Sequence, residues 1–180
     1  PAGRAITPLA PVVTFDACLA LLLAIFAGSS DQGAGRFVAE PLMDTPAIHD
    51  AAVFGPLSRV ERMLEQDPTS VGATDRFGFT ALHGVVAEHH FDIARLLIAK
   101  GADVNAGNDE GVTPLHLAAY PEMVEILVAN GARLDARDSN GNTPLHAVTE
   151  HPELIDVMEK LLKLGADPNA RNHDGASALD

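Results

Sequence analysis

Histidines are the residues of this chain whose type and spacing most directly suggest chemistry. Four of them, His49, His83, His116 and His146, are separated by 34, 33 and 30 positions. A neutral imidazole can bind a metal or transfer a proton, so both roles have to be considered. Zinc ligands must approach one ion within about 2.1 Å, whereas packed helical layers lie about 8–10 Å apart. If each histidine belongs to its own layer, the four cannot converge on one ion.

A second histidine pair offers a candidate surface metal site. His89 and His90 are adjacent, with Glu88 and Asp92 close by in the sequence. The pair falls where a turn between two helices is expected, and polar residues at such a turn are ordinarily solvent-exposed. The sequence favours this plain turn, so we predict no metal site.

Other chemical motifs are incomplete. Residues 107–111 (GNDEG) lack the D-x-[DN]-x-[DN]-G spacing of a calcium loop. Ser70, Ser139 and Thr149 lack the glycines of a nucleophile elbow. A Gly-x-x-x-x-Gly-Lys phosphate loop is also missing from the sequence. We therefore predict no catalytic residues, no cofactor and no enzyme activity in this segment.

The elements that position the histidines repeat with the same period. Residues 80–83 (TALH) open a helical pattern, and residues 113–116 and 143–146 (TPLH) repeat it. Each opening is followed by a second apolar helical stripe and then by a Gly-Ala pair. The predicted stripe residues are Ile48, Ala51, Ala52, Val60, Met63, Leu64, Ile93, Leu96, Leu97, Val157, Leu161 and Leu162. Leu82, Leu115 and Leu145 are expected to be buried at equivalent places.

These units resemble ankyrin repeats, which share the T-P-L-H motif and a period of about 33 residues. The resemblance covers residues 44–180 and implies an all-α ankyrin-repeat solenoid of helix-turn-helix units with projecting β-turns. About four units are expected, with a fifth beginning near Asn172. We call His49, His83, His116 and His146 the ladder histidines. The resemblance also implies that each of them forms structural hydrogen bonds at the start of a helix. A stack that ends in half a helix would expose an apolar face, so we expect the native chain to continue past Asp180.

Two units depart from the pattern. In the first, Thr45 is the expected N-cap and Pro46 the first helical residue, and residues 65–68 (EQDP) replace the usual glycine-containing exit. In the third, a deletion between Ala119 and Pro121 removes about one helical turn. We expect a truncated first helix there, which either notches the binding face or is a neutral loop deletion.

The N-terminal residues have a different character. Residues 1–28 contain an apolar run of 11 residues at 17–27, shorter than the 17–25 residues that span a bilayer. This run has the length of a secretory h-region, although Asp16 precedes it and Arg4 is the only cation upstream. A helix packed on the first repeat and a membrane anchor are the alternatives. A linker is predicted at 29–43; a cleaved signal would place the protein in the periplasm or outside the cell, otherwise in the cytoplasm.

Charge limits the class of partner. The net charge is −13, which opposes binding to nucleic acid and to anionic membranes. The single cysteine, Cys18, excludes an internal disulfide. The resemblance to ankyrin repeats implies a non-catalytic protein-protein interaction module, which we expect to be monomeric, and the acidic charge indicates a protein partner with a basic or mixed surface. A regulatory or targeting region of a larger enzyme and an exported ankyrin protein are the alternatives.

The resemblance also implies where a partner would bind, namely the repeat tips and the concave helix face. The tip residues carried over to this sequence are Arg76, Phe77, Phe79, Asp109, Glu110, Val112, Ser139, Asn140 and Asn142. Phe77 and Phe79 stand out in a chain with 4% aromatic residues. They either anchor a partner or cover the degenerate first unit.

Overall fold

The computed structural model describes residues 46–149 and 151–179. The chain divides into two parts, Pro1–Val38 and Ala39–Asp180, and every described residue lies in the second part. The predictions for residues 1–28, for the linker at 29–43 and for Thr45 concern residues outside this description.

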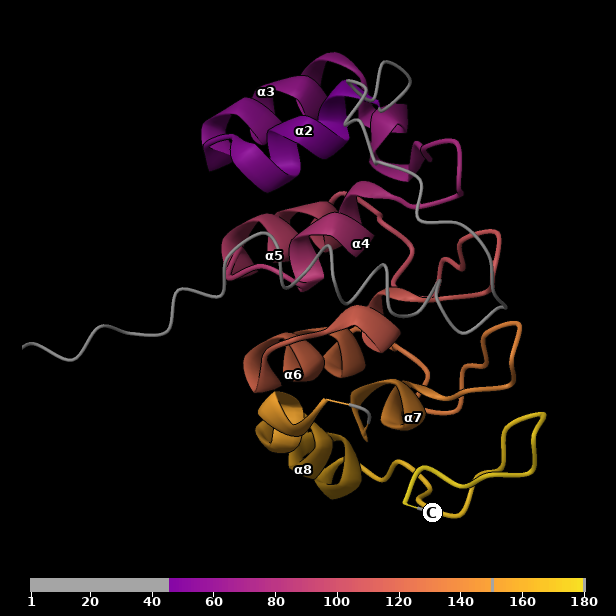
Figure 1. Cartoon of the computed structure of the whole chain (residues 1–180). Helices are drawn as coiled ribbons and strands as arrows, with labels where there is room; N and C mark the ends of the chain where they lie inside the picture. Colours follow the sequence, from indigo (N-terminus) through magenta and orange to yellow (C-terminus); the bar gives the residue numbers. More distant parts are fainter. Residues whose placement is uncertain (1–45, 150, 180) are drawn as a thin grey trace, which may run out of the picture. The chain divides into compact units, whose positions relative to one another are not determined.

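The described residues form successive helix pairs joined by projecting loops (Figure 1). The helices are α2 (Ala47–Phe54), α3 (Leu57–Gln66), α4 (Ala81–Val86), α5 (Phe91–Ala99), α6 (Pro121–Ala129), α7 (Pro144–Thr149) and α8 (Ile155–Lys163). Three 3-10 helices accompany them: η1 (Pro68–Gly72), η2 (Pro114–Leu117) and η3 (Pro152–Leu154). Within this part of the chain the only β-pairing is two isolated bridges, Thr74 with Thr80 and Arg171 with Ser177. The all-α solenoid predicted from the sequence is confirmed.

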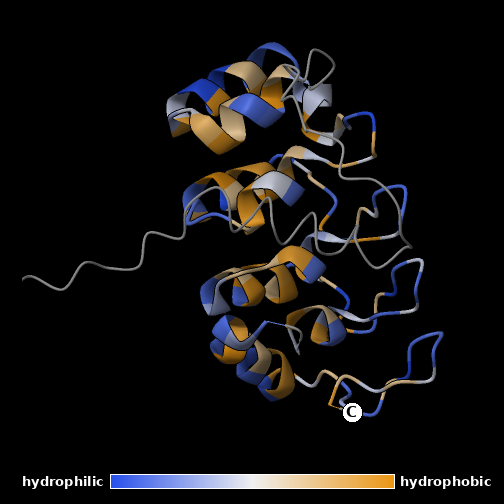
Figure 2. Cartoon of the chain, in the orientation of Figure 1, coloured by the Kyte–Doolittle hydropathy of each residue, from blue (hydrophilic) through white to orange (hydrophobic). Residues whose placement is uncertain are grey.

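Each helix pair belongs to one repeat unit: unit 1 contains α2 and α3, unit 2 contains α4 and α5, unit 3 contains η2 and α6, and unit 4 contains α7 and α8. Each helix packs against its counterpart in the next unit. The first helices contact one another in the order α2, α4, η2 and α7, and the second helices in the order α3, α5, α6 and α8. Figure 2 shows apolar residues on the helix faces that meet and hydrophilic residues along the loops. Stability in such a stack is roughly a sum of unit and nearest-neighbour interface contributions, because no unit buries its apolar face alone.

The core is aliphatic, as predicted. Leu82, Leu115 and Leu145 have no exposed surface. The remaining stripe residues are buried except for three. Met63, Leu96 and Leu162 are half-buried, because each lies at the edge of its stripe. No helix among residues 46–149 and 151–179 has the length and apolarity required to cross a bilayer.

The second helices of units 2 to 4 end in the same way. At the end of α5 the Ala102 N–H donates to the Leu97 carbonyl (2.9 Å), and the Gly101 N–H donates to the Ile98 carbonyl (3.0 Å). This pair of bonds is a Schellman motif, which requires a left-handed residue between them. Gly101 supplies it with φ +98°. Gly131 and Gly165 end α6 and α8 with equivalent bonds.

The first unit differs slightly from its prediction. Helix α2 begins at Ala47, so Pro46 precedes the helix instead of opening it. At the exit, the Asp67 carboxylate accepts the Thr69 N–H at 3.0 Å and thereby caps η1. This 3-10 helix replaces the glycine-ended exit of the other units.

The third unit contains the predicted truncation. Its first helix is reduced to the single 3-10 turn η2, and the chain then runs extended through Ala118 into α6. The Ala119 N–H donates to the Val86 carbonyl of the preceding unit at 3.4 Å. Tyr120, at the deletion point, lies edge-on to His89 and Phe91, with ring centroids 4.9 Å and 6.0 Å away. The residues that follow the shortened helix therefore contact unit 2.

Candidate partner-binding surface

The loop that projects from each unit is closed by one side-chain oxygen. In unit 2, Asp75 Oδ1 accepts the N–H groups of Phe77 (2.9 Å) and Phe79 (3.0 Å), and the Asp75 N–H donates to the Phe79 carbonyl (2.9 Å). Aspartate and asparagine favour such turns because their short side chains reach nearby backbone donors. Asn108, Asp138 and Asn172 make the same two side-chain bonds in the next three loops.

Successive loops are also bonded to each other. The Asp109 N–H donates to the Phe77 carbonyl at 3.1 Å, the Ser139 N–H to the Glu110 carbonyl at 2.7 Å, and the His173 N–H to the Asn140 carbonyl at 2.9 Å. The approach is so close that a Cβ on Gly78, which has φ +80°, would lie 2.8 Å from the Asp109 nitrogen. The backbone of the loops is thus a fixed row before any partner binds.

Two residues at the apex of each loop point outward. We call them the apex residues, and they are Arg76 and Phe77, Asp109 and Glu110, Ser139 and Asn140, and His173 and Asp174. All are exposed apart from Glu110, which is half-buried, and Phe77 is 42% exposed. Six of the residues predicted from the sequence lie in this row. The predicted binding residues omitted His173 and Asp174, although a fifth unit was expected to begin near Asn172 and Asp174-Gly175 matches Glu110-Gly111.

The residues that follow the loop glycines point inward, contrary to the prediction that placed them on the tip surface. Val112 is only 3% exposed. Phe79 is half-buried, with its ring edge-on to the His83 ring at 5.5 Å. Asn142 is half-buried and accepts the Asn172 Nδ2 donor at 3.0 Å. The tight turn reverses the chain at the glycine, so the next side chain returns to the stack.

Charge differs from loop to loop. At the unit 2 apex the Arg76 guanidinium lies over the Phe77 ring, 4.7 Å from its centroid. At the unit 3 apex both residues, Asp109 and Glu110, are acidic. The unit 4 apex is uncharged, with Ser139 and Asn140. The surface therefore changes in chemical character along the stack.

The ladder histidines form structural hydrogen bonds within and between units. His83 Nε2 lies 3.0 Å from the Val112 carbonyl of the next unit, and Nδ1 accepts the Thr80 N–H at 3.0 Å. Because a carbonyl can only accept, Nε2 carries the proton and Nδ1 is the acceptor. The Thr80 hydroxyl is 2.8 Å from the same Nδ1. The His83 ring thus helps to cap the start of its own helix, α4, and also bonds to the next unit.

The other ladder histidines repeat this geometry. Nε2 of His49, His116 and His146 lies 2.9, 3.1 and 3.2 Å from the carbonyls of Ala73, Asn142 and Ala176. Each ring faces a different acceptor, as expected for one histidine per layer. Burial lowers the pKa of His83 to about 4, against the opposing effects of the Val112 carbonyl and Asp75. Burial also lowers the pKa of His116. Both rings are therefore neutral at pH 7.

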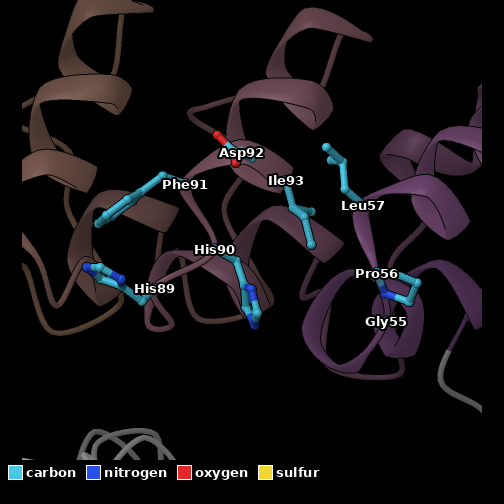
Figure 3. Close-up of a pocket in the computed structure, with 8 residues that line it drawn as sticks. All are labelled: Gly55, Pro56, Leu57, His89, His90, Phe91, Asp92 and Ile93. Atoms are coloured by element: carbon cyan, nitrogen blue, oxygen red, sulfur yellow. The ribbon is translucent and has the colours of Figure 1, made fainter.

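His89 and His90 lie beside a hollow of about 320 Å³ between the turns of units 1 and 2. Figure 3 shows their rings pointing in different directions, with His89 against Phe91; those ring centroids are 4.4 Å apart. No group of three potential metal ligands occurs among residues 46–149 and 151–179. The hollow is lined by Gly55, Pro56, Leu57, His89, His90, Phe91, Asp92 and Ile93.

Comparison with known proteins gives relatives of several kinds. Alpha-latrocrustotoxin-Lt1a of Latrodectus tredecimguttatus is 38% identical over 73 residues, 41% of this chain and 5% of that protein. The 2-5A-dependent ribonuclease of Mus musculus is 32% identical over 91 residues, 51% of this chain and 12% of that protein. Protein phosphatase 1 regulatory subunit 27 of Homo sapiens is 38% identical over 81 residues, 44% of this chain and 52% of that protein. The chain spans about half of the last relative and far less of the other two.

Two family models match the part of the chain that the structure describes. A model of three ankyrin repeats matches residues 48–138, and a model of one ankyrin repeat matches residues 140–173. These ranges contain the four ladder histidines, the first two loops and all of the stacked helices except the first residue of α2. The chain therefore belongs to the ankyrin-repeat family.

Proposed function

We propose that this chain is a non-catalytic module that binds a protein partner through its apex residues. Ankyrin repeats generally mediate protein-protein interaction. The observation that most supports the apex residues is the fixed backbone beneath them, which is held by side-chain bonds within each loop and backbone bonds between loops. A surface ordered before binding loses little conformational entropy when a partner arrives.

The distribution of polar groups supports the same assignment. The ladder histidines His83 and His116 accept hydrogen bonds from the threonine three residues before them and bond to the next unit. Their ring nitrogens are therefore already used within the fold. The apex side chains, by contrast, are exposed apart from Glu110, which is half-buried. With a net charge of −13, the partner is expected to present a basic or mixed surface.

The test is quantitative capture of a partner with a series of variants. A partner is first isolated with the full chain, and its affinity is then measured for Arg76→Ala, Glu110→Ala and Asn140→Ala. We expect at least one apex variant to weaken binding by tenfold or more, because a few residues dominate most interfaces.

The matched controls lie on the second helices, away from the loops. Arg95→Ala and Glu122→Ala remove exposed charges from α5 and α6 and are expected to leave affinity unchanged. If the helix variants weaken binding and the apex variants do not, the apex residues are the wrong surface.

A second candidate is that the repeats regulate a catalytic domain in a longer protein. The relatives favour it, since one is named a ribonuclease and another a phosphatase regulatory subunit, and this chain covers only part of each. The full reading frame decides between the two: a catalytic domain joined to these repeats would support regulation.

A further inference from the structure

The first two apices of the row carry opposite charges that do not pair with each other. Arg76 at the unit 2 apex is exposed and contacts the Phe77 ring. Asp109 and Glu110 form the next apex. Among the described residues, neither acidic side chain forms a salt bridge, and Arg76 forms none either.

The backbone places these two apices side by side. The hydrogen bond from the Asp109 N–H to the Phe77 carbonyl, 3.1 Å long, joins them directly. Arg76 is nevertheless held over its own aromatic neighbour, 4.7 Å from the ring centroid. A cation and two carboxylates thus lie on neighbouring loops; Arg76 and Asp109 are exposed and Glu110 is half-buried.

We propose that these apices form a bipolar site for an extended segment of a partner protein that carries one acidic and one basic side chain. The proposal rests on the proposed function and specifies the partner of that surface. Arg76 receives the carboxylate, which a guanidinium can bind through two parallel hydrogen bonds. Asp109 and Glu110 receive the basic side chain, and the Phe77 ring supplies an apolar contact beside Arg76.

The spacing of the units sets the spacing of the partner's charges. Equivalent positions of adjacent units lie about 8–10 Å apart, and an extended chain advances about 3.3 Å per residue. The acidic and basic residues of the partner should therefore be about three positions apart. The site ends at the unit 4 apex, where Ser139 and Asn140 carry no charge.

The experiment selects displayed random 12-residue peptides against the full chain. The winning peptides are synthesised, and their affinities are measured by fluorescence anisotropy at low and high salt. We expect enrichment of an acidic and a basic residue about three positions apart, in one dominant order. The best peptide should bind at least tenfold more weakly to a charge-swapped chain carrying Arg76→Glu, Asp109→Arg and Glu110→Arg.

Exchange of the two charged residues within the peptide should then restore binding to the charge-swapped chain. The matched control is Arg95→Ala with Glu122→Ala, which removes one exposed cation and one exposed carboxylate from α5 and α6, away from the loops, and should leave peptide affinity unchanged. Circular dichroism and thermal unfolding confirm that every variant is folded.

Three outcomes would overturn the bipolar site: no enriched peptide, enriched peptides without the charge pair, or equal binding to the original and charge-swapped chains. The proposed function would survive these outcomes if the partner isolated with the full chain still requires apex residues. It fails separately if that partner tolerates all apex variants.

Discussion

Acidification should destabilise the stack through its buried histidines, and His83 allows the effect to be measured. In the folded state Nδ1 accepts the Thr80 N–H, so a proton on that nitrogen would face a donor in place of an acceptor. Burial lowers the pKa of His83 to about 4, and the charge of His49 acts in the same direction, whereas the backbone of Val112 and Ala106 and the charge of Asp75 oppose the shift. The folded state therefore binds fewer protons than the unfolded state between pH 6.5 and pH 4.

The magnitude follows from the two pKa values. The ordinary histidine pKa is 6.5 and the folded value is about 4, and each pH unit of difference corresponds to about 1.36 kcal/mol. His83 should thus cost about 3 kcal/mol of stability across the whole window and about 2 kcal/mol by pH 5. The stability contributed by the neutral ring is complete above pH 6.5, falls as pH decreases and changes little below pH 4.

Urea unfolding at several pH values between 7.5 and 4.5 tests this prediction with His83→Gln. The variant cannot titrate at this position, so the stability advantage of the natural protein over it should shrink by about 2 kcal/mol between pH 7.5 and pH 5. Val85→Ala is the matched control, since it removes fully buried apolar surface and no titratable group. Its stability difference should stay constant. If the difference in unfolding free energy between the natural protein and His83→Gln does not change with pH, the inference that the buried His83 ring is neutral is wrong.

Further substitutions test the packing and the loops. Leu115→Ala should lower the unfolding free energy by about 2–5 kcal/mol, because Leu115 is fully buried between units, and hydrogen exchange should show units 3 and 4 loosened together. Gly78→Ala should lower the unfolding free energy by about 1–3 kcal/mol, because Gly78 has a positive φ and lies close to Asp109. Gly72→Ala is the control: Gly72 has open space around it, so this substitution should change the unfolding free energy by no more than about 1 kcal/mol. Equal effects of the two substitutions in thermal unfolding would contradict the loop geometry. Lys160→Met should cost at most about 1 kcal/mol in low-salt unfolding, because the ion pair with Glu125 is partly exposed.

The fold could be predicted from the sequence because its signals are local and repeated. Thr113-Pro114-Leu115-His116 specifies a helix start, a buried leucine and a histidine in four residues, and the register recurs in each unit. The truncation of unit 3 was also predictable, since a missing helical turn appears directly as a shorter spacing. The one-residue difference at Pro46 reflects how weakly sequence fixes a helix end.

The surface was less predictable than the core. Glu110 and Val112 are two positions apart and both flank Gly111, yet the first is an apex residue and the second is buried. Their directions depend on the left-handed glycine between them and on contacts with the next loop, which a single unit does not contain. Pairing of charges is equally invisible in the sequence: nothing there indicates that Arg76 contacts Phe77 and not Asp109.

The bond from each ladder histidine to the next unit has a consequence for how such proteins diversify. Its acceptor is a main-chain carbonyl, and the residues that provide it for His83, His116 and His146 are a valine, an asparagine and an alanine. Because every amino acid offers that oxygen, the joint between units makes no demand on the neighbour's side chain at this position. Units could therefore be duplicated, exchanged or lost during evolution while this junction stays intact, which leaves the outward-facing residues free to change with each new partner.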